Sequence, residues 1–363
     1  MCGQSLLRTY REYLPLKPCK SGLEKLHKNL KKIPLGVTIL KDTSGDDFMV
    51  WFIIATVALL LSAAFYVLLR FCFVRCFYVK EKRILKEDEF ETADGECYDP
   101  FREYMIEKMK ETRALPRKDY SIKSFDGLTL WGSFYELYEK GPIELMFHGY
   151  RGTAERDLCG AVNRCRRLGH SAFIVDQRAA TRSDGNVITF GVNESKDCLR
   201  WVDFVTNLFP ERKIIITGIS MGGATVLNAA SSKLPKNVVG VIADCSYSSA
   251  KEIITKVINT DMHLPGKVFY PFVKLSAKLF GKFDLEEISP IESVKKFTLP
   301  VLFIHGEDDN FVPCEMSRRL YSACSSDKML LTVPGADHGL SYLVDKDRYI
   351  KTFEEFERKY ISE

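Results

Sequence analysis

The pattern that most restricts the fold of this chain begins near residue 117, where short apolar runs start to alternate with amphipathic stretches. The runs lie at residues 143–148, 171–176, 213–217, 238–244, 300–305 and 328–333. They are almost continuously apolar, which is typical of parallel strands buried on both faces, and the stretches between them have helical periodicity. This alternation predicts an α/β domain with a mostly parallel sheet and helices on both faces.

Two segments add to this pattern. Residues 120–125 and 128–137 are β-rich and flank Asp126-Gly127, which is a strong signal for a hairpin. The interval 245–299 is too long for an ordinary crossover, so we expect an inserted helical cap over about 247–290. Aromatic side chains in this cap predict an apolar cover over the site and an acyl or other hydrophobic group in the substrate. Ordinary packing of the cap helices onto the core accounts for most of these residues equally well.

The strongest chemical motif follows the run at 213–217, where the chain reads Gly218-Ile219-Ser220-Met221-Gly222-Gly223 before an apolar helical stretch. This is G-x-S-x-G between a strand and a helix, the context in which a serine is held exposed on a sharp turn. Gly218 and Gly222 give the turn the room it needs. Ser220 is therefore the candidate nucleophile, at a helix N-terminus whose dipole favours developing negative charge.

A serine hydroxyl needs a base to take its proton, and a carboxylate usually orients that base. Among the six histidines, His338 lies after the last run and before a C-terminal helical stretch, the position of the base in the chain order Ser, acid, His. His148 and His305 end strands and precede glycine, which is typical of structural roles. For the acid, Asp309 is preferred, but chemistry alone leaves Asp308 and Asp244 as rivals.

Acyl transfer also needs donors for the oxyanion, each of which contributes roughly 3–4 kcal/mol. The backbone N–H of Met221, directly after the candidate nucleophile, is one expected donor. The loop after residues 143–147 reads His148-Gly149-Tyr150-Arg151-Gly152, and the N–H of Tyr150 is the second. No metal or organic cofactor is expected to take part.

Taken together, the segments 125–132, 148–150, 176–185, 218–223, 305–313 and 336–339 resemble the α/β-hydrolase superfamily. More narrowly, the chain is similar to membrane-anchored bacterial hydrolases of the serine aminopeptidase-like or BEM46-like group. The resemblance covers about residues 117–363. It implies Ser220, Asp309 and His338 as the triad, because H-G-x-x-D-x-x-V-P puts the acid at Asp309. One departure is Ala179-Ala180, where many relatives have a Gly-rich turn; this loop is structural, so the triad is not put in doubt.

Before this domain, residues 48–69 form an apolar run of 22 residues without a charge, long enough to cross roughly 30 Å of hydrocarbon as a helix. The run is followed by Arg70, large aromatic residues and Arg75, a poor site for signal-peptide cleavage. We therefore expect a retained single-pass anchor. The domain plan is a basic extension over 1–47, a transmembrane helix over 48–69, a charged linker and helix over 70–116, and the hydrolase domain over 117–363. Met49 stands at the start of the run, so initiation there would remove the extension.

Charge and thiols both favour the cytoplasmic side for the domain. Six basic residues follow the run between Arg70 and Lys86, whereas four precede it between Lys28 and Lys41. The 11 cysteines have no spacing typical of zinc sites and indicate reduced thiols. Cys72 and Cys76 beside the run are candidates for acylation. The net charge of +4 does not indicate nucleic acid as a partner.

The function expected is therefore a membrane-anchored serine hydrolase that acts on a small-molecule carboxylic ester or thioester. Because the family also includes peptidases and lipases, the resemblance names no substrate. A peptidase or aminopeptidase of the same fold is the first alternative, and it would need an acidic subsite for an α-amino group. A non-catalytic, membrane-tethered binding protein is the second, although no residue of the expected machinery has been lost.

Overall fold

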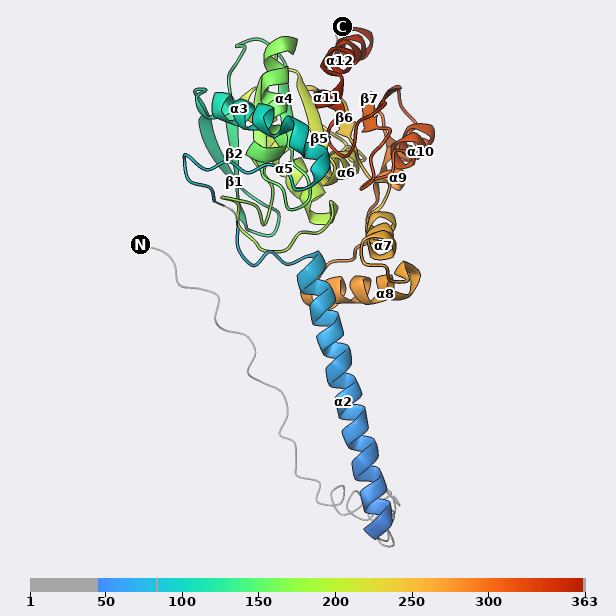
Figure 1. Ribbon diagram of the computed structural model, residues 1–363. Helices are drawn as coiled ribbons and strands as arrows, with labels where there is room; N and C mark the ends of the chain where they lie inside the picture. The colour runs from blue at the N-terminus through green and yellow to red at the C-terminus, as the bar shows by residue number, and fades with distance from the viewer. Residues whose placement is uncertain (1–44, 83, 362–363) are drawn as a thin grey trace, which may run out of the picture. The chain divides into compact units, whose positions relative to one another are not determined.

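The computed structural model describes residues 45–82 and 84–361, and its centre is one eight-stranded sheet (Figure 1). The strands are β1 (Lys118–Lys123), β2 (Thr129–Tyr135), β3 (Ile143–Phe147), β4 (Ser171–Asp176), β5 (Ile214–Ile219), β6 (Val238–Asp244), β7 (Val301–Gly306) and β8 (Lys328–Val333). Their order is β1-β2-β4-β3-β5-β6-β7-β8. All pairs from β4 to β8 are parallel, whereas β2 pairs antiparallel with both β1 and β4. The expected α/β fold is confirmed.

Each of the six apolar runs forms a strand, and the expected hairpin is β1–β2. Gly127 has φ +89° in its turn, a conformation that a side chain would disfavour. Residues of one strand alternate between two cores: Ile214 and Ile216 of β5 belong to one cluster and Ile215 to another. This period of two, with both faces apolar, explains why the runs lack polar alternation.

Helices cover both faces of the sheet. On one face α5 (Val192–Leu208), α6 (Met221–Ala229) and α10 (Glu315–Ala323) pack through buried residues such as Trp201, Val226 and Leu320. On the other face α4 (Ala154–Leu168) and α12 (Lys346–Tyr360) bury Leu158 and Phe353. Shorter elements are η2 (Glu96–Phe101), α3 (Arg102–Arg113), α9 (Pro290–Ser293), η4 (Val294–Lys296) and α11 (Ser341–Val344).

The N-terminal helix α2 (Gly45–Cys76) contains the apolar run. It is the one helix in the described part of the chain that is long and apolar enough to cross a membrane. The described part of the chain divides into two units, residues 45–64 and 65–361. In the first, apolar side chains from Phe48 to Leu61 are exposed. In the second unit, α2 continues past residue 69, the expected end of the transmembrane helix, because Cys72 and Phe73 pack into the core of that unit.

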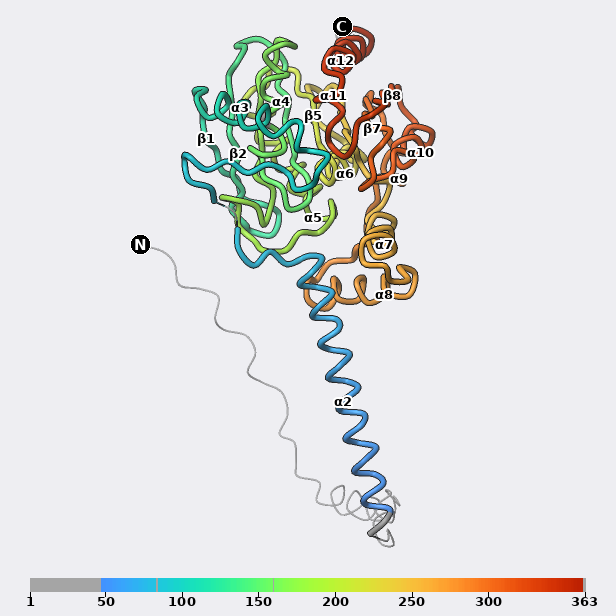
Figure 2. Tube along the Cα trace, in the orientation of Figure 1, coloured from blue at the N-terminus to red at the C-terminus, as the bar shows by residue number. Residues whose placement is uncertain are grey.

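The insertion at 247–290 is helical, as expected, and consists mainly of α7 (Ala250–Thr260), α8 (Gly266–Ser276) and η3 (Ala277–Gly281). Of these, α8 and η3 lie beside the last turns of α2 (Figures 1 and 2). The buried Phe73 and Phe77 share one apolar cluster with Ile254 and Tyr270 of the insertion. The insertion therefore packs the end of α2 onto the unit that contains the sheet.

Two expectations concern other parts of the chain. The extension 1–47 lies, except for its last three residues, outside the described residues. The eight cysteines whose side chains are described are all free, and Cys72 is buried while Cys76 is half-buried. Modification of the Cys72 thiol would therefore require it to leave the core.

Candidate active site

Ser220 connects β5 to α6 in a turn that only glycine neighbours allow. Its φ of 56° and ψ of −116° lie outside the usual regions for a residue with a side chain. A Cβ on Gly218 would come within 2.1 Å of the Gly222 carbonyl oxygen, and a Cβ on Gly222 within 2.0 Å of the Phe147 carbonyl oxygen. The Ser220 N–H donates to the Asp244 carbonyl at 2.8 Å, which ties the turn to β6. Ser220 is thus fixed at the carboxyl edge of the sheet.

Three of the expected site residues meet in a chain of hydrogen bonds. The Ser220 hydroxyl lies 2.9 Å from Nε2 of His338, and Nδ1 of His338 lies 2.7 Å from Oδ2 of Asp309. Asp309 follows β7 and His338 follows β8, so loops at the same edge of the sheet bring together residues 118 positions apart. An imidazole that donates through Nδ1 presents Nε2 as an acceptor, and this leaves Ser220 as the donor.

The surroundings of the carboxylates separate Asp309 from its rivals. Oδ1 of Asp309 accepts the backbone N–H groups of Phe311 at 3.0 Å and Val312 at 2.7 Å. Burial alone raises the pKa of Asp309, but hydrogen bonds from the two imidazoles of His305 and His338 hold it at about 2. Burial raises the pKa of Asp244 to about 6, and this carboxyl accepts from Tyr349. Asp308 is exposed. Only Asp309 is buried, ionised and bonded to His338.

His305 was expected to shape a loop, and the structure shows which one. Its ring is fully buried, with Nε2 at 2.8 Å from the Val312 carbonyl and 3.1 Å from Oδ2 of Asp309. Nδ1 lies 2.6 Å from the Ser317 hydroxyl. His305 therefore holds the loop that carries Asp309. The feature of the sequence that indicates this role is the position of His305 four residues before Asp309.

Cys245 brings a thiol close to the same groups. Its Sγ and one ligand atom each of Asp309 and His338 lie within 4.8 Å of one another, so the set could in principle hold a metal ion. A metal ligand must be a thiolate, however. Burial and the nearby Asp244 and Asp309 carboxylates raise the pKa of Cys245 well above its usual range. The described residues therefore suit a proton-transfer chain better than a metal.

The two expected oxyanion donors belong to the turn at Ser220 and to the loop that precedes α4. Met221 is the first residue of α6, so its N–H has no helical partner. The loop with Tyr150 passes over the serine, because a Cβ on Gly149 would lie 3.5 Å from the Ser220 Cβ. The next residue, Arg151, has φ +52°. Met221 thus directly follows the serine in the chain, and Tyr150 follows Gly149 in the loop that approaches it, so their role as oxyanion donors stays a prediction.

The side chains of this loop also cap the end of α2. The Tyr150 hydroxyl donates to the Cys76 carbonyl at 2.8 Å. The Arg151 guanidinium donates to the carbonyls of Arg75 at 3.1 Å and Tyr78 at 3.0 Å. Sequence reasoning missed these contacts, because backbone carbonyls leave no signal in the sequence.

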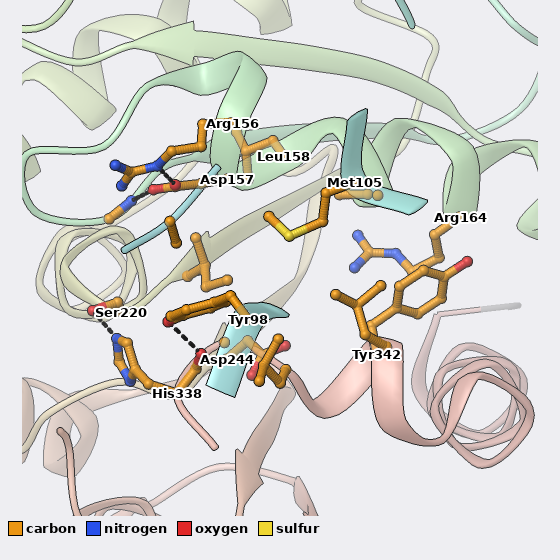
Figure 3. A pocket seen from close by; sticks show the side chains of 18 of the residues that line it. Tyr98, Met105, Arg156, Asp157, Leu158, Arg164, Ser220, Asp244, His338 and Tyr342 are labelled. Carbon is orange, nitrogen blue, oxygen red and sulfur yellow. Dashed lines mark hydrogen bonds and ion pairs between the residues drawn. The ribbon is translucent and has the colours of Figure 1, made fainter. Parts of the chain in front are cut away.

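A pocket of about 220 Å³ opens at Ser220 (Figure 3). Its lining includes Tyr98 and Met105 from the N-terminal side, Leu158 from α4 and Tyr342 from α11. The Tyr98 hydroxyl donates to the His338 carbonyl at 2.8 Å, so η2 is fixed directly beside the base. The expectation that the 247–290 insertion covers the serine is wrong. Residues of η2 and α3 line the pocket instead, and the insertion contributes none of its lining residues.

Comparison with known proteins agrees with the fold. Residues 145–290 match the family model described as alpha/beta hydrolase fold, and residues 289–346 match the model described as serine aminopeptidase, S33. An esterase of Pyrococcus furiosus superposes with a TM-score of 0.57 at 19% identity, over 78% of this chain and 100% of that chain. This chain has the α/β-hydrolase fold. An acylaminoacyl peptidase of Pyrococcus horikoshii superposes with a TM-score of 0.51 at 20% identity, over 70% of this chain and 43% of that one.

Proteins related in sequence show which α/β hydrolases this chain resembles most specifically. The uncharacterised protein YqkD of Bacillus subtilis is 31% identical over 190 residues, which is 52% of this chain and 62% of that protein. Protein bem46 of Schizosaccharomyces pombe is 26% identical over 53% of this chain and 60% of its own length. Each of these matches spans less than two thirds of the relative. The resemblance to serine aminopeptidase-like and BEM46-like hydrolases is confirmed.

Proposed function

We propose that this protein is a serine hydrolase that cleaves carboxylic esters or thioesters through an acyl-enzyme on Ser220. The observation that carries the proposal is the hydrogen-bond chain from Ser220 through His338 to Asp309 at the base of a pocket. A serine, an imidazole and a buried carboxylate in this order have the geometry of acyl-transfer catalysis. The low pKa of Asp309 keeps a negative charge beside the imidazolium that would form.

In the proposed reaction, Ser220 Oγ attacks the substrate carbonyl carbon while its proton passes to Nε2 of His338. The N–H groups of Met221 and Tyr150 stabilise the oxyanion. The bond to the leaving group then breaks, and His338 returns the proton to the departing alcohol or thiol. Water, deprotonated by His338, attacks the acyl-enzyme and releases the carboxylic acid.

The pocket supports an acyl substrate of moderate size. Met105, Leu158 and Ala161 give it apolar walls. Two of the arginines in its lining already have carboxylate partners: Arg156 donates to Asp157 at 2.7 Å, and Arg164 pairs with Glu144. We therefore expect short or medium acyl chains to be preferred over charged acyl groups.

A second candidate function rests on Asp244. This carboxyl lines the pocket, and its Oδ1 atom is buried without a hydrogen-bond partner among the described residues. A buried carboxylate of this kind could bind the α-amino group of an aminoacyl substrate, as a peptidase requires. The reaction at Ser220 would be the same.

The test compares p-nitrophenyl acyl esters with aminoacyl p-nitroanilides for the wild type, Ser220→Ala and Asp244→Asn. We expect ester hydrolysis to be lost in Ser220→Ala and to persist in Asp244→Asn. Undiminished ester hydrolysis in Ser220→Ala would refute the serine mechanism. Higher kcat/KM for the anilides, lost in Asp244→Asn, would favour the peptidase.

Membrane attachment is part of the proposal. The apolar helix α2 supports an anchor, and an uncharacterised membrane protein of Saccharomyces cerevisiae is 26% identical over 50% of this chain and 58% of its own length. We propose a single-pass anchor with the hydrolase domain on the cytoplasmic side, where the larger basic flank lies. Protease protection of the domain in intact cells checks the side.

A further inference from the structure

Helix α8 has apolar side chains on two opposite sides. Tyr270, Val273 and Ala277 are buried against α7 and the end of α2. On the other side Val268 is 58% exposed and Leu275 is 37% exposed, and the half-buried Phe272 lies between them at helical spacing. Leu279 continues this side into η3 with 54% exposure. A helix that faces water carries polar residues on such a side.

This exposed apolar side adjoins the part of α2 that belongs to the apolar run. The ring of Phe272 contacts Phe65 with centroids 6.1 Å apart, and the ring of Phe280 contacts Tyr66 at 5.8 Å. Phe65 lies four residues before the end of the run, a rise of about 6 Å along a helix. Elements in contact with it therefore lie near the membrane–water boundary if the run spans a bilayer.

The charges around α8 complement an anionic lipid surface. Residues 262–283 contain four lysines and no acidic residue. Lys267, Lys278 and Lys282 are exposed, and so is Arg70 at the end of the run, whose guanidinium lies 4.9 Å from the centre of the Phe280 ring. Basic residues that flank an apolar helix side are typical of helices that lie in the membrane interface.

We propose that α8 and η3 form a second membrane contact, lying in the interface with Val268, Leu275 and Leu279 among the lipid chains. Lys267, Lys278 and Lys282 contact the phosphate groups of anionic lipids. This contact is additional to the span, it rests on the proposed anchoring, and it does not depend on the hydrolase activity. It would hold the domain at a fixed height and orientation on the bilayer.

The test places tryptophan in the full-length protein reconstituted into vesicles of phosphatidylcholine with about 30% phosphatidylglycerol. Leu275→Trp reports on α8 and Leu279→Trp on η3, and brominated lipids quench tryptophan by contact. Val344→Trp is the matched control, because Val344 is 38% exposed on α11, at the other end of the domain from α8 in Figure 1. Trp51 within the apolar run is an internal reporter of the span.

We expect at least a twofold loss of the added fluorescence for Leu275→Trp and Leu279→Trp, and no loss for Val344→Trp. Unquenched probes on α8 in a protein whose Trp51 is quenched would overturn the proposal while the anchor stands. An unquenched Trp51 would instead refute the anchor, and the proposal with it. Blue-shifted but unquenched probes at high protein-to-lipid ratio would assign the surface to a second copy of the chain.

The proposed contact between the lysines and anionic lipids is tested by a separate pair of variants. In the Leu279→Trp background, Lys267→Gln with Lys278→Gln should reduce quenching in vesicles with phosphatidylglycerol and have little effect in vesicles of phosphatidylcholine alone. Lys351→Gln on α12 changes charge at an exposed site away from α8 and should have no effect. Equal quenching in both vesicle types for the parent protein would contradict the role of the lysines.

Discussion

Replacing Asp309 with asparagine removes the negative charge of the proposed triad. The two backbone N–H groups of Phe311 and Val312 need an acceptor, so the asparagine oxygen takes the place of Oδ1. Its amide NH2 then occupies the Oδ2 position, 2.7 Å from Nδ1 of His338. Because that group donates, Nδ1 must accept, and the imidazole proton moves to Nε2, where it faces Ser220. The base is then in the wrong tautomer for proton abstraction.

A tautomer change of this kind in a serine protease lowers kcat by about 10⁴, equivalent to about 5 kcal/mol. We expect a loss of that order in ester hydrolysis for Asp309→Asn, with a lower thermal midpoint, because the amide NH2 also replaces the oxygen that lies 3.1 Å from Nε2 of the buried His305. Asp308→Asn removes the same charge from the exposed neighbour and should stay within twofold of the wild type. A kcat for Asp309→Asn above a tenth of the wild-type value would refute this account of His338, as would an equal loss in Asp308→Asn.

Three further predictions concern the turn, the loop and a buried ion pair. In Gly222→Ala the new Cβ would lie 2.0 Å from a backbone oxygen, so this variant should have a lower thermal midpoint and no labelling by a fluorophosphonate. Gly160→Ala is the control, because the nearest atom to its Cβ lies at 3.6 Å. Its thermal midpoint should be unchanged or raised. Arg151→Met removes the guanidinium that donates to the carbonyls at the end of α2. We expect this loss to displace the neighbouring Tyr150 N–H and so to lower kcat with KM unchanged. A change in KM alone would contradict the positioning role. Burial lowers the pKa of His170, but hydrogen bonds to Glu144 and Glu357 raise it to about 9. Protonated His170 contributes at most about 3 kcal/mol to the free energy of unfolding, in full below about pH 6.5, and this contribution is lost as the pH rises through 9. The difference in thermal midpoint between wild type and His170→Gln should therefore shrink over that range.

Local patterns predicted the sheet and the serine turn well. A strand buried on both faces is a continuous apolar run wherever it occurs, and the turn at Ser220 needs small residues at Gly218 and Gly222 in any such fold. These constraints act within a few residues, so the sequence carries them directly. The choice among Asp244, Asp308 and Asp309 is different in kind. It depends on which loop at the edge of the sheet reaches His338, and only the resemblance to known hydrolases indicated it.

Contacts between distant segments were not predictable in the same way. The aromatic residues of the insertion at 247–290 predict a cover over the pocket, but it is Tyr98 of η2 that bonds to His338, across 240 positions of the chain. The insertion packs instead on the end of α2, where Phe73 and Phe77 gave its aromatic residues an apolar partner. Aromatic side chains predict burial, but they do not specify which surface buries them.

Peptide mapping of a covalent adduct tests the central claim most directly. The full-length protein is treated with a fluorophosphonate, digested, and analysed by mass spectrometry beside Ser220→Ala and His338→Ala. We expect a single stoichiometric adduct on Ser220 in the wild type, none in Ser220→Ala, and labelling at least 100-fold slower in His338→Ala. An adduct on a residue other than Ser220, or undiminished labelling of Ser220→Ala, would contradict the proposal that Ser220 is the nucleophile.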